Sequence, residues 1–284
     1  MRQWILSSLL IMGCAGILAP AQSRPTDRTI FADEFSGREL DRSKWNVIIT
    51  GETVNDEQQA YVDSEETIAI VHDAQGSDGG ALAIRARYKP QFTTPEGAKF
   101  DFISGRLDTR SKFDFTYGTA SARVKLTAGA GLWPAFWTLG NGNWPDTGEM
   151  DIMENVGDPA WINFALHGPK YSGGSALAKR KYFTAPEGIT GWHVYTMRWT
   201  TDALVFLVDD REEYRVTRAA VEQRGRWAFD NPKFLIVNQG IGGDYPRAVN
   251  GVTAPYKGLP QSTVDVIKEG NAVLLVDWIR VTKS

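Results

Sequence analysis

Four stretches of this 284-residue chain alternate apolar residues with other residues at the spacing of a β-strand. Because the side chains of a strand point alternately to its two faces, this period places the apolar members of each stretch on one buried face. These members are Leu82, Ile84 and Ala86; Ala122, Val124 and Leu126; Tyr195, Met197 and Trp199; and Leu204, Phe206 and Val208. Clusters of Gly, Pro, Asn and Asp separate the stretches, and Thr200-Thr201-Asp202 predicts a hairpin between the last two.

Sustained helical periodicity is almost absent, and the best short candidate for a helix is the segment 217–223. The pattern therefore predicts an all-β chain that folds as a two-sheet antiparallel β-sandwich. No internal repeat or low-complexity linker divides the sequence. Since all-β domains commonly exceed 200 residues, we expect residues 24–284 to form a single domain.

Three carboxylates, Glu149, Asp151 and Glu154, lie within six residues of an otherwise apolar, strand-like run. Acidic groups so close together cannot all stay ionised, and at least one is expected to hold its proton near neutral pH. A protonated acid beside an ionised one is the pair that hydrolysis of a glycosidic bond needs. Strict alternation would put Glu154 on the opposite face, so we predict a β-bulge between Asp151 and Glu154. On composition alone, solvated acids on an exposed strand are an equal alternative.

The segments around these acids resemble glycoside hydrolase family 16, whose laminarinase-like members, of the endo-β-1,3-glucanase type, carry E-x-D-x-x-E after W-P-A-x-W-x-L. The resemblance extends over nearly all of residues 24–284. The matching segments are 31–35 (FADEF), 55–61 (NDEQQAY), 104–107 (SGRL), 113–118 (FDFTYG), 131–140 (GLWPAFWTLG) and 276–281 (VDWIRV), with Asn238 and Gly242-Gly243. A single E-x-D-x-x-E motif would be a weak signal of family membership. Together with the other matching segments, in the same order along the chain, it is a strong one.

The resemblance implies a jelly roll of the concanavalin A type, in which a concave sheet binds the sugar. It assigns Glu149 as the catalytic nucleophile, Glu154 as the general acid/base and Asp151 as the residue that hydrogen-bonds and tunes the nucleophile. In such a retaining mechanism the acid/base donates a proton in the first step and accepts one from water in the second. No metal or other cofactor is required for this chemistry.

Eight further residues are candidates for substrate binding. The indole rings can lie against sugar faces, and the guanidinium offers a planar set of donors to hydroxyl groups. The candidates are Trp133, Trp137, Trp144, Arg106, His167, Asn55, Glu57 and Asn238. The polar candidates have structural alternatives: a salt bridge of Arg106 to Asp151 or Glu57, a satisfied structural role for His167, and local backbone hydrogen bonds for Asn55, Glu57 and Asn238. For Trp144, packing in the core is an equal alternative.

The resemblance also implies a structural calcium ion on the far side of the sandwich, near Glu34 and Asp277. Calcium prefers oxygen ligands, which these carboxylates supply. No loop dense in Asp and Asn supports this ion independently of the resemblance.

Residues 1–23 have the pattern of a signal peptide: Arg2, then an apolar run, then a small-residue cleavage region. We therefore expect export, either secretion or transfer to the periplasm. The segment Ile11-Met12-Gly13-Cys14 loosely resembles a lipoprotein signal, so a lipid anchor through Cys14 is the alternative. Because Cys14 is the only cysteine, the chain has no disulfide framework.

The formal net charge of −3 argues against nucleic acid or an anionic membrane as a partner. It also disfavours a heavily sulfated polysaccharide, unless a local basic patch overrides the total. We expect a monomer without a membrane span whose partner is a polysaccharide.

The leading interpretation is a secreted retaining endo-glycosidase that cleaves β-1,3-glucan such as laminarin. The alternatives are the same mechanism on a β-galactan such as agarose or porphyran, or on mixed-linkage β-glucan; a transglycosylase; and a non-catalytic lectin-like domain, which three clustered acids disfavour. Three departures from the family pattern are expected near the substrate: Asn155, Gln239 and the segment 244–247 (DYPR). The segment 170–181, with a basic cluster at Lys179-Arg180-Lys181, is expected to be a solvated loop, and the alternative is that it shapes one end of the groove.

Overall fold

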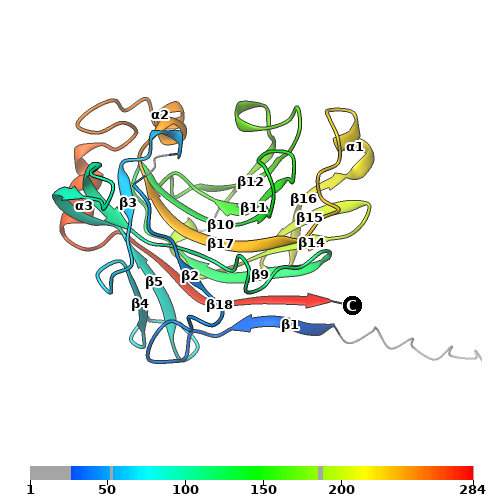
Figure 1. The fold of residues 1–284 in the computed structure, drawn as a ribbon, viewed down its shortest axis with the longest axis horizontal. Coiled ribbons are helices and arrows are strands. Elements are labelled where there is room, and N and C mark those ends of the chain that lie inside the picture. The colour runs from blue at the N-terminus through cyan, green and yellow to red at the C-terminus, as the bar shows by residue number, and fades with distance from the viewer. Residues whose placement is uncertain (1–26, 52–53, 185–187, 284) are drawn as a thin grey trace, which may run out of the picture.

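The computed structural model describes residues 27–51, 54–184 and 188–283 of the chain. Within these residues, two large antiparallel sheets pack face to face, and a small third sheet lies at one end (Figure 1). The predicted all-β sandwich is therefore confirmed. The predicted signal peptide 1–23 and the predicted anchor Cys14 lie outside the described residues.

Eight of the described strands form the first sheet, in the order β16-β15-β14-β9-β18-β5-β4, with β1 paired to β18 beside this path. Their bounds are β1 Arg28–Asp33, β4 Ile68–Val71, β5 Ala81–Arg85, β9 Gly118–Lys125, β14 His193–Trp199, β15 Ala203–Val208, β16 Arg211–Thr217 and β18 Val273–Lys283. All four alternating stretches of the sequence lie along this sheet, on β5, β9, β14 and β15. The predicted hairpin joins β14 to β15.

Seven described strands form the second sheet, in the order β13-β12-β11-β10-β17-β8-β2. Their bounds are β2 Asn46–Val47, β8 Arg106–Asp108, β10 Leu132–Gly140, β11 Glu149–Glu154, β12 Trp161–His167, β13 Leu177–Tyr182 and β17 Lys233–Ile241. Every residue of β17 is buried, and so are the first six of β12. Because both faces of these strands are covered, their sequences do not alternate, and periodicity could not identify them.

The small sheet, in the order β3-β7-β6, contains β3 Gln59–Tyr61, β6 Arg87–Thr93 and β7 Lys99–Ser104. Strands β3 and β7 are parallel, which is an exception to the antiparallel pattern of the sandwich. Strand β7 runs into β8 through Gly105, so the small sheet continues into the seven-stranded sheet at its β8 end.

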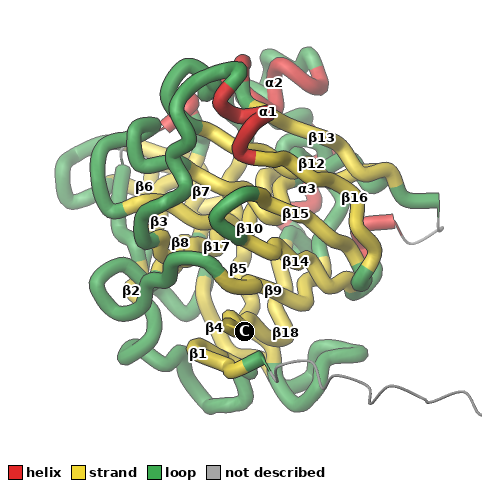
Figure 2. The backbone as a smooth tube through the Cα atoms, turned by 90° about the vertical axis from the view of Figure 1, so that its right-hand side faces the viewer, coloured by secondary structure: helices red, strands yellow, loops and turns green. Residues whose placement is uncertain are grey.

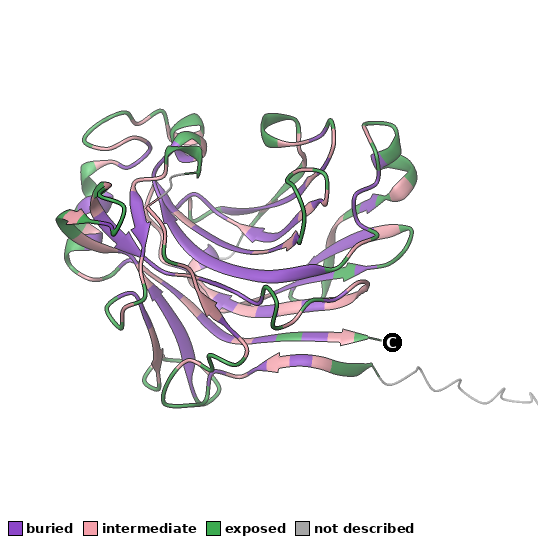
Figure 3. Ribbon diagram, in the orientation of Figure 1, coloured by how far each residue is buried: buried purple, intermediate pink, exposed green. Residues whose placement is uncertain are grey.

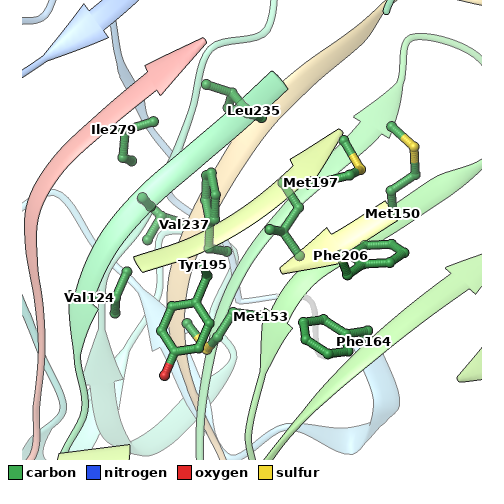
Figure 4. Close-up of a cluster of buried hydrophobic side chains, with 14 of the residues drawn as sticks. Val124, Met150, Met153, Phe164, Tyr195, Met197, Phe206, Leu235, Val237 and Ile279 are labelled. Atoms are coloured by element: carbon green, nitrogen blue, oxygen red, sulfur yellow. The ribbon is translucent and has the colours of Figure 1, made fainter. Parts of the chain in front are cut away.

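The core lies between the two large sheets. Figure 4 shows Val124, Tyr195, Met197, Phe206 and Ile279 of the eight-stranded sheet against Met150, Met153, Phe164, Leu235 and Val237 of the seven-stranded sheet. A smaller buried cluster lies where α3 packs near β6 and includes Phe102, Leu259, Val264 and Ile267. Figure 3 shows buried residues along the strands and exposed residues at the surrounding loops. A chain without disulfides is thus stabilised by a large apolar core, as expected.

Helix α1 (Arg218–Glu222) confirms the one predicted helix, and the Thr217 hydroxyl caps it by accepting a hydrogen bond from the Ala220 amide at 3.2 Å. The described residues also contain α2 (Asp244–Asn250) and α3 (Gln261–Lys268), which the sequence analysis did not predict. Both helices are too short to give a sustained periodic pattern. The 3₁₀ turns are η1 (Val54–Asp56), η2 (Gly173–Ser175) and η3 (Gly188–Thr190).

The expected solvated loop at 170–181 is wrong in its second half, because residues 177–182 form the edge strand β13. The described part of the chain contains no helix long and apolar enough to cross a membrane.

The seven-stranded sheet is curved, and the face that points away from the core is concave (Figure 1). Helix α2 and several loops rise around this concave face, while β1 and β18 lie on the opposite side of the molecule (Figures 1 and 2). Side chains of β10, β11 and β12 that turn away from the core therefore project from the concave face.

Candidate active site

The predicted bulge is present in strand β11. Asp151 lies opposite Trp137 of β10, and Met153 lies opposite Phe136, which leaves Ile152 without an opposing residue. The register with β12 shifts in the same place, between Asp151 and Glu154. One extra residue in β11 is the definition of a β-bulge.

The bulge places all three acids on the same face of the sheet. Two consecutive side chains turn into the core there, together with that of Met150. The core-facing residues of β11 are Met150, Ile152 and Met153, all fully buried in the inter-sheet cluster. The residues left to project from the concave face are Glu149, Asp151 and Glu154.

Indole and amide groups donate hydrogen bonds to the two outer acids. Glu154 accepts one from Nε1 of Trp133 at 2.8 Å and one from Nδ2 of Asn163 at 3.1 Å. Glu149 accepts one from Nε1 of Trp144 at 2.7 Å. Each outer acid thus has its own tryptophan partner, from β10 for Glu154 and from the β10–β11 connection for Glu149.

His167, at the end of β12, contacts the other two acids, as the resemblance implied. Its Nε2 lies 3.2 Å from Oδ2 of Asp151 and 3.9 Å from Oε1 of Glu149. Its Nδ1 accepts a hydrogen bond from the backbone amide of Gly173 at 3.1 Å. Because an amide N–H can only donate, the neutral ring carries its proton on Nε2, where it is directed to Asp151.

Glu149, Asp151 and His167 also form the one group among the described residues whose ligand atoms lie close enough together, within 4.8 Å, to hold a metal ion. A metal bound to Nε2 would require the neutral ring to carry its proton on Nδ1. That proton would face the N–H of Gly173, which is itself a donor. The surroundings of His167 therefore favour hydrogen bonding to Asp151 over metal binding.

Burial raises the pKa of all three acids. It raises the pKa of Glu149 to about 8, aided by the charge of Asp151 and opposed by His167 and Trp144. Burial and then the charge of Glu154 raise the pKa of Asp151 well above its usual value. Burial also raises the pKa of Glu154, against the hydrogen bonds from Asn163 and Trp133. The cluster therefore holds protons near neutral pH, as the sequence predicted.

A second polar group lies on the β17 side of the acids. Nε1 of Trp137 donates to Oδ1 of Asn238 at 2.8 Å, and Nδ2 of Asn238 donates to the Tyr61 hydroxyl at 3.1 Å. The Tyr61 hydroxyl donates in turn to Glu57 at 3.0 Å. The guanidinium of Arg106 lies over the Trp137 ring, 5.0 Å from its centroid. This chain of contacts fixes the orientation of Trp137 from the small sheet inward.

The alternative salt bridge of Arg106 is not found: among the described residues, no ion pair joins Arg106 to Glu57 or to Asp151. The buried Nε of Arg106 has no hydrogen-bond partner there either. Burial raises the pKa of Glu57, while hydrogen bonds from Gln59 and Tyr61 and the charge of Arg106 oppose that rise. Arg106 therefore interacts with Glu57 through space and keeps donor capacity for another molecule.

The remaining predicted residues lie at the edge of the concave face. Asn55 is exposed in η1, which packs against α2. Trp144 is 51% exposed although its Nε1 is bonded to Glu149. The structure thus brings the other predicted residues into two adjoining groups around the acids and leaves Asn55 at the rim.

The residues suggested for calcium do not fit a cation as they stand. Both carboxylate oxygens of Glu34 accept hydrogen bonds from Arg280, at 2.8 and 2.7 Å. Asp277, which is 1% exposed, accepts one from Arg123 at 2.5 Å and one from the Asp78 amide at 2.8 Å. Each carboxylate is already neutralised by a guanidinium, so a calcium ion would meet two positive groups.

Two residues of the site were missed by the sequence analysis. Asn163 lies four residues before His167 on the same face of β12, so strand alternation could have identified it. Tyr245, from α2, contacts the ring of Trp133 with centroids 5.4 Å apart. No periodic signal predicted α2, although Tyr245 belongs to one of the three noted departures from the family pattern.

The other two departures do not project from the concave face. Asn155 is fully buried, and it bonds to the backbone of Asp158, Trp161 and Gly157 in the β11–β12 connection. Gln239 is 2% exposed and lies opposite Pro134 on the core side of the sheet. Both side chains therefore turn away from the substrate face, although Asn155 directly follows Glu154 in the chain.

Residues 41–257 match the sequence model of the glycosyl hydrolases family 16. The chain belongs to this family. The sandwich described above is therefore its jelly roll, and this family 16 enzyme is an endo-glycanase that acts on a polysaccharide.

Similar proteins share most of the chain. The beta-glucanase of Rhodothermus marinus is 32% identical over 257 residues, which cover 86% of each chain. The X-ray structure of the endo-β-1,3-glucanase from Pyrococcus furiosus superposes with a TM-score of 0.76 at 32% identity, over 90% of this chain and 94% of that one.

A third relative has a different specificity. The keratan-sulfate endo-1,4-β-galactosidase of Sphingobacterium multivorum is 29% identical over 263 residues, covering 89% of this chain and 54% of that protein. Relatives at about the same identity thus act on different polymers, so family membership does not fix the substrate.

Proposed function

We propose that this family 16 enzyme hydrolyses internal β-1,3 linkages of a glucan with retention of configuration, with Glu149 as the nucleophile and Glu154 as the acid/base. The observation that carries the proposal is the bulge at Ile152, which turns both glutamates to the concave face with Asp151 between them. The names of several relatives, among them the endo-β-1,3-glucanase of Pyrococcus furiosus, support the choice of β-1,3-glucan.

In the first step, Glu149 attacks the anomeric carbon while Glu154 transfers its proton to the departing oxygen. A glycosyl ester forms on Glu149, and the leaving chain carries away the proton. In the second step, Glu154 removes a proton from water, which breaks the ester and restores both acids. The buried surroundings that raise the pKa of Glu154 keep it protonated for the first step.

Asp151 and His167 influence the ionisation of Glu149, the proposed nucleophile. The Nε2 proton of His167 points to Asp151, which interacts with Glu149. His167 and the indole N–H of Trp144 both favour the ionised form of Glu149, against burial and the charge of Asp151. These groups thus counteract the effect of burial on the pKa of Glu149. They increase the fraction of Glu149 that is ionised and can attack.

The aromatic residues of the concave face supply the sugar contacts. Trp133 and Trp137 lie two strand positions on either side of Ala135, so both rings project from β10 beside the acids. Flat rings can pack against the apolar faces of pyranose units. Trp137, fixed by Asn238 and stacked on Arg106, is the better positioned of the two for binding.

The direct test is release of reducing ends from laminarin. We expect activity in the wild-type enzyme and its loss in Glu149→Ala and Glu154→Ala. Proton NMR of the first product should show the β-anomer, since a double displacement retains configuration. Full activity in either variant, or an initial α-anomer, would contradict the mechanism.

A substrate with an activated leaving group separates the two roles. A dinitrophenyl β-glycoside needs little protonation to depart, so Glu154→Ala should still form the glycosyl ester and release a burst of dinitrophenol. Glu149→Ala should release none. If both variants behave alike on this substrate, the two roles are wrongly assigned.

Substrate identity requires a panel of polymers. We expect laminarin to be cleaved with a higher kcat/KM than mixed-linkage β-glucan, agarose or porphyran. The galactosidase among the relatives makes a β-galactan the second candidate. Products longer than the starting oligosaccharide would reveal transglycosylation, and binding without any turnover would favour a lectin-like protein.

A polymeric substrate accords with the export predicted from residues 1–23, and we propose that the enzyme acts outside the cytoplasm.

A further inference from the structure

The edge strand β13 directs one basic side chain to the concave face. Arg180 lies opposite Asn163 of β12, so the two side chains project from the same face. The neighbouring lysines turn to the other side, where Lys179 donates to the backbone and Lys181 to the carboxylate of Glu213 in β16. Arg180 is exposed, and among the described residues it forms no ion pair with a carboxylate.

Two aromatic residues contact the Arg180 guanidinium, and a third projects from the same face nearby. It lies over the ring of Trp161, 3.9 Å from the centroid, and this tryptophan is only 2% exposed. Tyr182 projects from the same face two residues later and is 59% exposed. The hydroxyl of Tyr245, whose ring contacts Trp133, approaches Arg180 from α2. These residues form a surface of aromatic rings with one unpaired charge, which we call the β13 site.

The β13 site lies to one side of the reacting acids, in the direction that runs across the strands of the sheet. Asn163, opposite Arg180, donates to Glu154, so the site lies on the β12 side of the acid/base. Strand β13 is two positions from β11, or roughly 10 Å at the usual spacing of strands in a sheet. A group bound by Arg180 therefore belongs to a sugar further along the chain, and not to the cleaved linkage.

The charge of Arg180 has no role in the proposed mechanism. A neutral sugar would use its N–H donors only, whereas an anionic substituent would use both the donors and the charge in a two-pronged contact. The net charge of −3 disfavours sulfated glycans for the chain as a whole. Locally, however, Arg180 forms no ion pair among the described residues, and burial raises the pKa of the three nearby acids, which reduces their negative charge near neutral pH.

We propose that Arg180 is a specificity-determining residue that binds an anionic group, a sulfate ester or a carboxylate, on a sugar of the glycan beyond the cleaved bond. This inference rests on the proposed function for the location of the cleaved bond. It defines a substrate class, β-glucans with scattered negative substituents, that the enzyme prefers to the neutral polymer.

The test compares kcat/KM on neutral laminarin, lightly sulfated laminarin and laminarin oxidised at C6 to carboxylate. The variants are Arg180→Gln and, as a matched control, Lys179→Gln, which removes the same charge from the adjacent residue on the opposite face of the strand. We expect Arg180→Gln to lower the ratio of charged-substrate to neutral-substrate kcat/KM by about fivefold, as for a partly exposed ion pair. Lys179→Gln should leave this ratio unchanged, and high salt should reduce the effect of Arg180→Gln.

A lower ratio with only one of the two charged polymers supports the proposal and identifies the anion. Equal changes of the ratio in Arg180→Gln and Lys179→Gln, or an equal loss on charged and neutral polymers in Arg180→Gln, would overturn it. An enzyme inactive on laminarin contradicts the proposed function instead. In that case, binding of charged oligosaccharides to Glu149→Gln, with and without Arg180→Gln, still tests the β13 site: equal affinities would exclude it.

Discussion

Glu149 is held in surroundings that do not suit an ionised carboxylate. Burial is the largest cause of its raised pKa, and the charge of Asp151 adds to it, while Trp144 and His167 only partly compensate. A nucleophile that must be ionised to react is therefore kept where the protonated form is preferred. Activity at this residue is expected to cost the enzyme stability.

The first prediction concerns stability. The pKa of Glu149 is about 8 in the folded protein, against 4.5 for the ordinary group. Between these pH values the folded state binds a proton that the unfolded state has released, so the free energy of unfolding falls as the pH rises through this window. The variant Glu149→Gln removes this loss of stability, because a glutamine side chain does not titrate. We expect the variant to be more stable than the wild type at pH 8.5 by on the order of 3 kcal/mol, with little difference at pH 4.5.

Urea unfolding at both pH values measures the effect. Glu65→Gln, which alters an exposed carboxylate far along the chain from the acids, is the control and should show no such pH dependence. A Glu149→Gln variant that is equally or less stable than the wild type at pH 8.5 would contradict the burial argument.

The second prediction concerns the pH profile. Since the charge of Asp151 raises the pKa of Glu149, Asp151→Asn should lower that pKa, and the acid limb of kcat/KM should move to lower pH by roughly half to one unit. The maximal rate should also fall, because the residue that tunes the nucleophile is lost. The measurement is kcat/KM on laminarin from pH 4 to pH 9. An acid limb that stays in place, or moves to higher pH, would show that Asp151 does not act through its charge.

At the scale of the element, strand β11 depends on one extra residue. The sequence predicted this bulge because three acids with a common task need a common face, and the pattern of core residues around Ile152 now explains how the backbone provides it. The same reasoning could have identified Asn163, because positions 163 and 167 of any strand share a face and His167 was already a candidate. It could not identify Tyr245, which lies on a short helix without a periodic pattern. Arg180 was indicated only as part of a basic segment that was expected to be a loop, and no pattern distinguished it from the neighbouring lysines.

The third prediction tests the bulge by deleting Ile152. Without the extra residue, regular alternation would still place Glu154 on the concave face opposite Ala135, but the local bend and added twist that the bulge gives to the strand would be lost. Because the lost bend changes the direction of the Glu154 side chain, and a misplacement of about 1 Å can cost about 100-fold, we expect kcat to fall by about 100-fold. The measurement is kcat on the folded fraction, as judged by circular dichroism.

Ile152→Ala is the matched control for the deletion. It removes the same buried side chain but keeps the length of the strand, so it should lose about 2–4 kcal/mol of stability and retain most of kcat. If the deletion and Ile152→Ala have equal activities, the bend at the bulge is not what directs Glu154 to its working position.

At the scale of the whole molecule, the sequence predicted one sheet much better than the other. The alternating stretches on β5, β9, β14 and β15 belong to the sheet with one face toward solvent, where the period of two is clear. Strands β12 and β17 are covered on both sides and show no alternation, and only the family resemblance indicated them. The parallel pairing of β3 with β7 joins segments about 40 residues apart along the chain, and no local pattern reports such contacts.

The fourth prediction concerns metal. The carboxylates of Glu34 and Asp277 are neutralised by Arg280 and Arg123, so we expect the same Tm in excess calcium and in a chelator. Arg123→Met should lower the free energy of unfolding by about 3–5 kcal/mol, because it leaves the buried carboxylate of Asp277 without its cation. Differential scanning calorimetry of both proteins, with and without calcium, makes the measurement.

The double variant Arg123→Met/Asp277→Asn is the control, and it should recover part of the lost stability because no buried charge remains. A rise in the Tm of the wild-type enzyme on addition of calcium would show that a cation does bind and that the arginines give way to it.

Strand β1 runs antiparallel to β18, with Arg28 opposite Lys283. Both ends of the described chain therefore leave the domain at neighbouring points of the eight-stranded sheet, behind the face that carries the acids (Figure 1). A short peptide could join them into a circular permutant without crossing that face. By the same geometry, a tether attached at either end would hold the enzyme at its eight-stranded sheet and leave the catalytic surface open to a long insoluble polymer.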